Sequence, residues 1–239
     1  MTARPRLDAV ILDAGGTLIR LDFEWMAADL ASHGFKISAG DLRRAEVEGR
    51  RAYDASAVLD GKPQRGDVRA YLGGALRAAN VSPAMVEPAV DRFLAHERAS
   101  GLWSRPMEGA REALDALGAM GLRTAVVSNS DGRAEKHLAS ADMRRGVEFV
   151  VDSHLVGIEK PDPAIFQVAL GRLGTTPERT LFVGDIRSVD EAGARAAGMP
   201  FVLLDPYRNY AAPDSPRIDG MHDLAKWIGA GFDVAPVPR

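Results

Sequence analysis

An aspartate after a short apolar run, followed by two glycines, is the segment of this chain best suited to chemistry. Asp13 follows the apolar residues 9–12 and precedes Gly15 and Gly16. Such a run is typical of a buried strand, and glycines let a backbone approach a ligand closely. The pattern places one carboxylate at a strand end, above a loop of free N–H groups, where it could attack an anionic substrate. A solvated aspartate in an ordinary turn is the alternative interpretation.

Three later segments carry polar side chains at similar places. They are residues 125–129 (AVVSN), 157–163 (GIEKPDP) and 181–190 (LFVGDIRSVD). Their candidate functional residues are Ser128, Asn129, Lys160, Asp185 and Asp190. In an open α/β sheet, ligands bind beyond the carboxyl ends of the strands, where the strand order reverses. We therefore expect these side chains to converge with Asp13.

Apolar runs and helical patterns alternate along most of the chain. The strand candidates are residues 7–12, 122–127, 148–151, 180–183 and 201–204. Their nearly continuous apolar character favours strands covered on both faces, as in a parallel sheet. Helical patterns separate the last four; one helix is expected to begin at Asp162 and Pro163, and another at a Ser188 N-cap. The sequence thus predicts an α/β fold with a doubly wound parallel sheet.

Residues 22–103 interrupt this alternation, because they contain no convincing strand. Their apolar spacing predicts four helices, near residues 23–33, after Ser38, from Val68 and after Ser82. Residues 61–66 (GKPQRG) are the expected loop among them. We predict an α/β catalytic core of residues 1–21 and 104–239, with a small all-helical domain at residues 22–103.

Taken together and in this order, the four segments resemble the motifs of the haloacid dehalogenase-like hydrolase superfamily. The resemblance accounts for the layout of almost the whole chain. It implies a Rossmann-like core whose helical insert caps the active site. Specificity in capped members comes from cap side chains, for which the unranked candidates here are Trp25, Arg51, Tyr53, Arg65 and Tyr71.

The resemblance also implies a role for each candidate residue. Asp13 would be the nucleophile that forms an aspartyl-phosphate, and Lys160 would balance charge on Asp13 and on the phosphate. The phosphate-binding groups would be the backbone N–H groups near Gly15 and Gly16, the Ser128 hydroxyl, the Asn129 backbone N–H and Lys160. The Mg²⁺ site would consist of Asp13, the Gly15 carbonyl, Asp185 and, through water or as an outer partner, Asp190.

Gly15 departs from the family pattern. Most phosphatases of the family carry a second aspartate there, which protonates the leaving oxygen and then activates water. Such a positioned acid–base group contributes roughly 10²–10⁴-fold to the rate. The enzyme could be a slow phosphatase, or one that borrows an acid from the cap or substrate. It could instead cleave carbon–halogen or carbon–phosphorus bonds, or be a weakly active or non-catalytic binding member.

Composition and charge narrow the classes of partner. The chain has 239 residues, 46% of them hydrophobic, with a formal net charge of −3 and no cysteine. The negative charge argues against a nucleic-acid or anionic-membrane binder, and the missing cysteines exclude disulfides and thiolate chemistry. No segment has the length of a signal-peptide core or a membrane span. We expect a cytoplasmic monomer or homodimer that acts on a small phosphorylated molecule.

Overall fold

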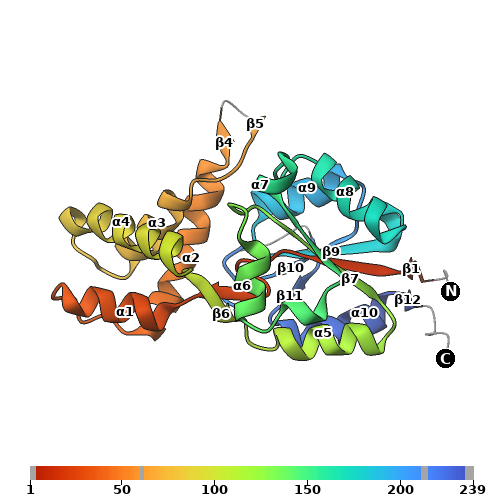
Figure 1. Cartoon of the computed structure of the whole chain (residues 1–239), viewed down its shortest axis with the longest axis horizontal. Helices are drawn as coiled ribbons and strands as arrows, with labels where there is room; N and C mark the ends of the chain where they lie inside the picture. Colours follow the sequence, from red (N-terminus) through yellow and green to blue (C-terminus); the bar gives the residue numbers. More distant parts are fainter. Residues whose placement is uncertain (1–3, 60–61, 211–214, 235–239) are drawn as a thin grey trace. The chain divides into compact units, whose positions relative to one another are not determined.

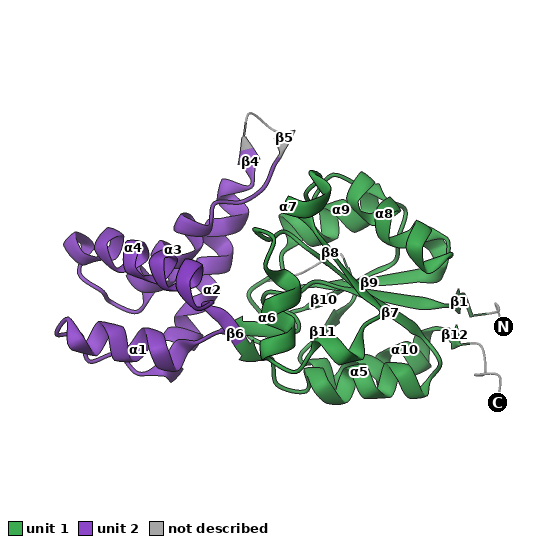
Figure 2. Ribbon diagram, viewed as in Figure 1, with its two compact units in different colours: residues 1–20, 105–239 green, residues 21–104 purple. Residues whose placement is uncertain are grey.

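The structure is a computed structural model that describes residues 4–59, 62–210 and 215–234. The chain forms two compact units and passes between them twice. Residues 1–20 and 105–239 form the first unit, and residues 21–104 form the second (Figure 2). At the two crossings, strand β3 (Ile19–Leu21) pairs with strand β6 (Trp103–Pro106). Each unit has its own buried apolar cluster.

The apolar runs of the first unit form a six-stranded sheet. Its strands are β2 (Ala9–Leu12), β7 (Arg123–Ser128), β8 (Phe149–Asp152), β9 (Thr180–Gly184), β10 (Phe201–Leu204) and β11 (Arg217–Ile218). They lie in the order β11-β10-β9-β2-β7-β8 and pair in parallel. The chain runs outward from β2 to β8 and then returns to β9 on the other side of β2. The strand order therefore reverses at β2, where a ligand site is expected.

Helices cover both faces of this sheet. Helices α8 (Ala164–Leu173) and α9 (Ala192–Ala196) lie on one face, and α5 (Ala110–Ala119) and α10 (Leu224–Gly231) lie on the other (Figure 1). Two shorter helices, α6 (Ala134–Ser140) and α7 (Ser153–Val156), follow β7 and β8. All four residues of β2 are buried, as expected for a strand covered on both faces. The predicted doubly wound α/β fold is confirmed.

Four helices dominate the second unit. They are α1 (Phe23–Ser32), α2 (Ala39–Ser56), α3 (Val68–Ala78) and α4 (Pro83–Ala99). Ser38 and Asp41 form a capping box at the start of α2, and Pro83 occupies the first turn of α4, where its missing N–H costs nothing. Leu30, Leu72 and Phe93 belong to the buried cluster among these helices.

Several details differ from the sequence-based prediction, among them the unpredicted strand β11. The expected strand at residues 7–12 is two strands, because β1 (Arg6–Leu7) leaves the main sheet to pair with β12 (Asp233–Val234). The second unit adds a short antiparallel pair, β4 (Val58–Leu59) and β5 (Lys62–Pro63), to its helices. Part of the loop predicted at 61–66 is therefore a strand, and Gly61 lies outside the described residues.

Ser188 is not the N-cap of the helix after β9. A five-residue π-helix, Arg187–Glu191, precedes α9, so Ser188 lies inside it. No side chain of the described residues caps this π-helix; instead the Asp190 carboxylate accepts from the backbone N–H groups of Asp185 and Ile186, which precede it. Within the described ranges, no helix combines the length and apolar character needed to cross a membrane.

Candidate active site

An ion-paired group lies at the carboxyl end of the central strand β2. Asp13 directly follows β2, and its Oδ1 accepts a hydrogen bond from Lys160 Nζ at 2.6 Å. Lys160 Nζ also donates to Asp190 Oδ1, at 2.7 Å. The exposed fraction of the side chain is 2% for Lys160, 11% for Asp13 and 2% for Asp190. One buried lysine therefore joins two buried carboxylates from different elements.

Burial and mutual attraction set the protonation of this group. Removal from water raises the pKa of Asp13 to about 6, although Lys160 opposes the rise. Burial alone would lower the pKa of Lys160, but Asp13 and Asp190 outweigh burial and raise that pKa above its usual value. Lys160 thus stays protonated, and Asp13 is mainly ionised at neutral pH.

The carboxylate of Asp190 is bonded through both oxygens. While Oδ1 accepts from Lys160, Oδ2 accepts from the backbone N–H groups of Asp185 and Ile186, each at 3.0 Å. Gly184 makes this arrangement possible, because a Cβ there would lie 2.5 Å from the Asp190 Cγ. Asp190 thereby connects the buried lysine to the end of β9.

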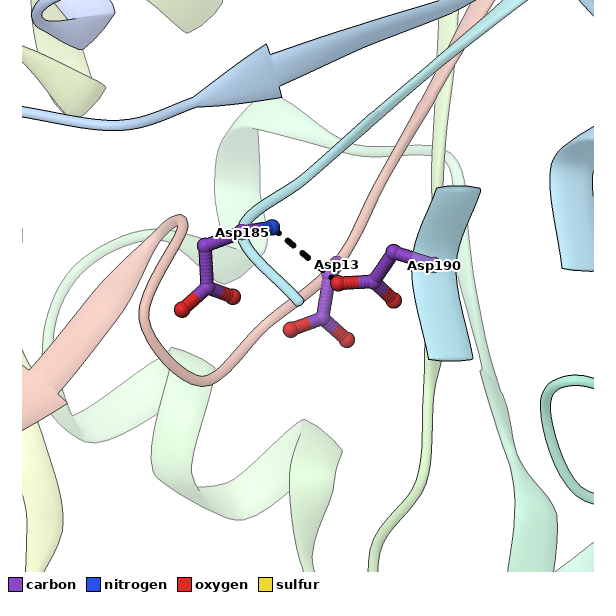
Figure 3. A group of neighbouring side chains, drawn as sticks. All are labelled: Asp13, Asp185 and Asp190. Carbon is purple, nitrogen blue, oxygen red and sulfur yellow. Dashed lines mark hydrogen bonds between the residues drawn. The ribbon is translucent and has the colours of Figure 1, made fainter. Parts of the chain in front are cut away.

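Three carboxylates form a cluster that fits a divalent cation. Asp13, Asp185 and Asp190 are buried, and one oxygen of each lies within 4.8 Å of the others (Figure 3). They carry three negative charges against the positive charge of Lys160. Buried charges of one sign are costly unless a counter-ion compensates them. Carboxylate oxygens are the ligands that Mg²⁺ and Ca²⁺ prefer, so the chemistry of the donors and their surplus charge both suit such an ion.

The turn after β2 depends on Gly16. Its φ is 83°, in the region that favours glycine, and a Cβ there would overlap the Asp185 carboxylate. Gly15 precedes it and forms an isolated bridge with Ile19. In this turn the Gly16 backbone N–H donates to the Ile19 carbonyl at 2.7 Å, so the prediction that it binds phosphate is wrong. Gly16 thus brings the backbone after Asp13 close to Asp185.

The other two predicted phosphate ligands lie at the end of β7. Ser128 is the last residue of that strand and is buried. Asn129 follows it, and its side chain hydrogen-bonds the main chain of Lys160. Since β7 is the neighbour of β2 in the sheet, these residues lie at the same edge as Asp13.

The cap candidates make contacts within the second unit. Tyr71 is buried and donates from its hydroxyl to Glu46 at 2.5 Å, and the Trp25 ring stacks on His96. Arg51 pairs with Glu48, Tyr53 meets Tyr71 edge-on, and Arg65 is exposed. The packing explains Trp25, Tyr53 and Tyr71 as parts of this unit's interior.

Besides the bond between Lys160 and Asp190, two further features of the site were not predicted from the sequence. The ring centroid of Phe182 lies 5.3 Å from Lys160 Nζ, a distance at which a ring face attracts a cation. The Asn129 side chain binds Lys160, whereas only its backbone N–H was expected to act. Phe182 could have been suspected from its place in the strand before Asp185, but no sequence signal pointed to the Asn129 contact.

The chain belongs to the haloacid dehalogenase-like hydrolase family, whose model matches residues 7–198. Haloacid dehalogenase-like hydrolase domain-containing protein 3 of Mus musculus is 31% identical over 214 residues, which cover 85% of this chain and 84% of the mouse protein. N-acetylmuramic acid 6-phosphate phosphatase of Pseudomonas aeruginosa is 32% identical over 216 residues, or 87% of this chain and 88% of that enzyme.

Solved structures agree with the fold. The structure of a dehalogenase with an intermediate complex is 23% identical in sequence to this chain and has a TM-score of 0.61. The match covers 95% of this chain and 98% of the dehalogenase chain. At this identity the likeness shows the fold alone. The family match identifies this chain as a hydrolase, and the substrate must be argued from the site.

Proposed function

We propose that this chain is a metal-dependent phosphatase of a small phosphorylated metabolite, with Asp13 as the nucleophile. The observation that carries the proposal is the buried lysine that bonds both Asp13 and Asp190, beside a carboxylate cluster suited to a divalent cation. A fixed positive charge next to a carboxylate nucleophile, together with a divalent cation held by the cluster, would suit an anionic phosphate. The relative from Pseudomonas aeruginosa, which is named a phosphatase, supports the same class of reaction.

In the first step, the Asp13 oxygen that is not bonded to Lys160 attacks phosphorus. A bond forms between this oxygen and phosphorus, and the bond from phosphorus to the leaving oxygen breaks. The leaving oxygen keeps the electron pair and takes a proton from water, because Gly15 has no acidic side chain. In the second step, a water oxygen bonds to phosphorus while the bond between phosphorus and the Asp13 oxygen breaks. The electron pair returns to the Asp13 carboxylate, the water gives a proton to solvent, and inorganic phosphate leaves.

Several groups hold the phosphoryl oxygens in line for these steps. They are the Ser128 hydroxyl and the backbone N–H groups of Gly15 and Asn129, while Lys160 balances the charge. Asp13, Asp185, the Gly15 carbonyl and, less directly, Asp190 would hold Mg²⁺. When bound, this ion reduces the repulsion between Asp13 and the phosphate. We assign the helical unit, predicted at residues 22–103, the role of a cap that selects the substrate.

Carbon–halogen hydrolysis is a second candidate, which Gly15 favours. A halide ion leaves with its electron pair and needs no proton, so the missing acid would not matter. In that reaction Asp13 would attack carbon, and a buried carboxylate cluster would have no obvious use. The metal-suited cluster therefore favours the phosphatase.

An assay on two substrates separates these candidates. The purified protein is incubated with p-nitrophenyl phosphate or a 2-haloacid, each with Mg²⁺ or with excess chelator. Phosphate release that requires Mg²⁺ is the expected result. Halide release that continues in the chelator would replace the proposal with the second candidate, and no release of either product would contradict both.

A further inference from the structure

Asn129 joins the end of β7 to the loop that carries Lys160. Its side-chain Nδ2 donates to the Lys160 carbonyl oxygen, and its Oδ1 accepts from the Lys160 backbone N–H, each at 2.8 Å. One carboxamide therefore satisfies both main-chain polar groups of a residue 31 positions away in the sequence. This two-point contact fixes the backbone of Lys160 against the strand that ends in Ser128.

Lys160 needs such a support because regular structure does not supply one. It lies between α7 and α8, outside any helix or strand. Its side chain is long and has many rotamers to lose when it is fixed. The carboxylates of Asp13 and Asp190 hold the Nζ end, and Asn129 holds the backbone end. The lysine is thus held at both ends.

We propose that Asn129 is a positioning residue, which places the Lys160 ammonium between Asp13 and the phosphoryl group. This inference rests on the proposed function, in which Lys160 balances charge during phosphoryl transfer. Reacting groups need tight placement, because an error of about 1 Å can cost about 10²-fold in rate. Asn129 would act on the reaction only through Lys160, separately from its backbone N–H.

The neighbouring residue Ser153 offers a matched control. Its hydroxyl accepts from the Ser130 backbone N–H at 3.1 Å and donates to the Ser130 carbonyl at 3.2 Å. Ser153→Ala therefore removes one accepted and one donated hydrogen bond to the main chain of Ser130. Asn129→Ala removes the same two kinds of bond to the main chain of Lys160. Ser153→Ala leaves the contacts of Lys160 intact.

The test is a double-mutant cycle on p-nitrophenyl phosphate at saturating Mg²⁺. Asn129→Ala should lower kcat by about tenfold or more, while Ser153→Ala should stay close to the wild type. In a Lys160→Ala background, Asn129→Ala should have little further effect, because its partner is gone. Equal fold losses in both backgrounds, or an equal loss from Ser153→Ala, would show that Asn129 merely holds the loop.

A second readout does not depend on activity. Labelling of Lys160 by an amine-reactive reagent, followed by mass spectrometry, should be faster in Asn129→Ala than in the wild type or in Ser153→Ala. Unchanged labelling would overturn the positioning role, whether or not the wild type hydrolyses phosphate esters. Absence of hydrolysis by the wild type would separately refute the proposed function. If Asn129→Ala does not fold, the isosteric Asn129→Asp takes its place, since it faces the Lys160 carbonyl with an oxygen and loses that bond.

Discussion

At the scale of single residues, the two glycines after Asp13 have different constraints. The left-handed φ of 83° and the close approach to Asp185 both belong to Gly16. Gly15 is the position at which the resemblance predicts the second aspartate of most family phosphatases, and it is not among the residues with positive φ. The backbone at Gly15 therefore does not itself demand a glycine.

Replacing Gly15 by aspartate tests whether the missing general acid limits the rate of hydrolysis. Gly15→Asp should speed the hydrolysis of alkyl phosphates by roughly 10–10³-fold, within the range for one positioned acid. Aryl phosphates should gain less in the first step, because their leaving groups need less protonation. The measurement is kcat/KM for one alkyl and one aryl phosphate in the wild type and the variant.

A structural control accompanies this comparison. Gly16→Ala should lose activity, because its Cβ would displace the Asp185 carboxylate and its φ is unfavourable for alanine. Circular dichroism and the melting temperature establish that Gly15→Asp is folded. A folded Gly15→Asp without any gain on alkyl phosphates would refute the explanation of Gly15 as a lost acid.

At this scale the sequence predicts residues better than contacts. The pattern of an apolar run followed by a polar residue pointed to Asp13, Ser128 and Asp185, all at strand ends. It could not predict that Lys160 would bond Asp190 or that the Asn129 carboxamide would bond Lys160. These contacts join distant parts of the chain, and periodicity describes only local structure.

At the scale of elements, strand ends deliver the carboxylates. Asp13 follows β2 and Asp185 follows β9, which are neighbours in the sheet. The predicted strands lie close to the observed ones because continuous apolar runs define strands buried on both faces. Ser188 misled the prediction, since the π-helix begins at Arg187 without a side-chain cap from the described residues, which a local N-cap rule does not consider.

The two aspartates after β9 should differ in their effect on metal dependence. Asp185→Ala should raise the Mg²⁺ concentration needed for half-maximal activity more than Asp190→Ala does. The reason is that both oxygens of Asp190 already accept protein hydrogen bonds. Titration of Mg²⁺ after removal of metal by a chelator measures this difference. A larger shift for Asp190→Ala would make Asp190 the stronger ligand.

At the scale of the whole molecule, two separate cores support the two units. Phe166 and Phe182 belong to the core of the first unit, and Phe93 belongs to that of the second. The assignment of the second unit as a cap is a proposal. The cytoplasmic location and the monomeric or homodimeric state stay predictions from the sequence.

Separate cores predict separate responses to mutation. Phe93 is fully buried, and Phe93→Ala should cost about 3–5 kcal/mol of stability, as is usual for a large core truncation. Hydrogen exchange should become faster in residues 21–104, while β2 and β9 keep their protection. Phe166→Ala is the matched control in the other core. Equal loss of protection in both units after Phe93→Ala would mean that they unfold together.

The central claim is that Asp13 carries the phosphoryl group during turnover. Its most direct test is mass spectrometry of protein quenched in acid during hydrolysis of p-nitrophenyl phosphate with Mg²⁺. We expect one added phosphoryl group on the peptide that contains Asp13. Asp13→Asn should show neither this group nor turnover, because the neutral amide is nearly isosteric but cannot act as the anionic nucleophile. Turnover by Asp13→Asn at the wild-type rate, or a phosphoryl group on another residue, would contradict the account.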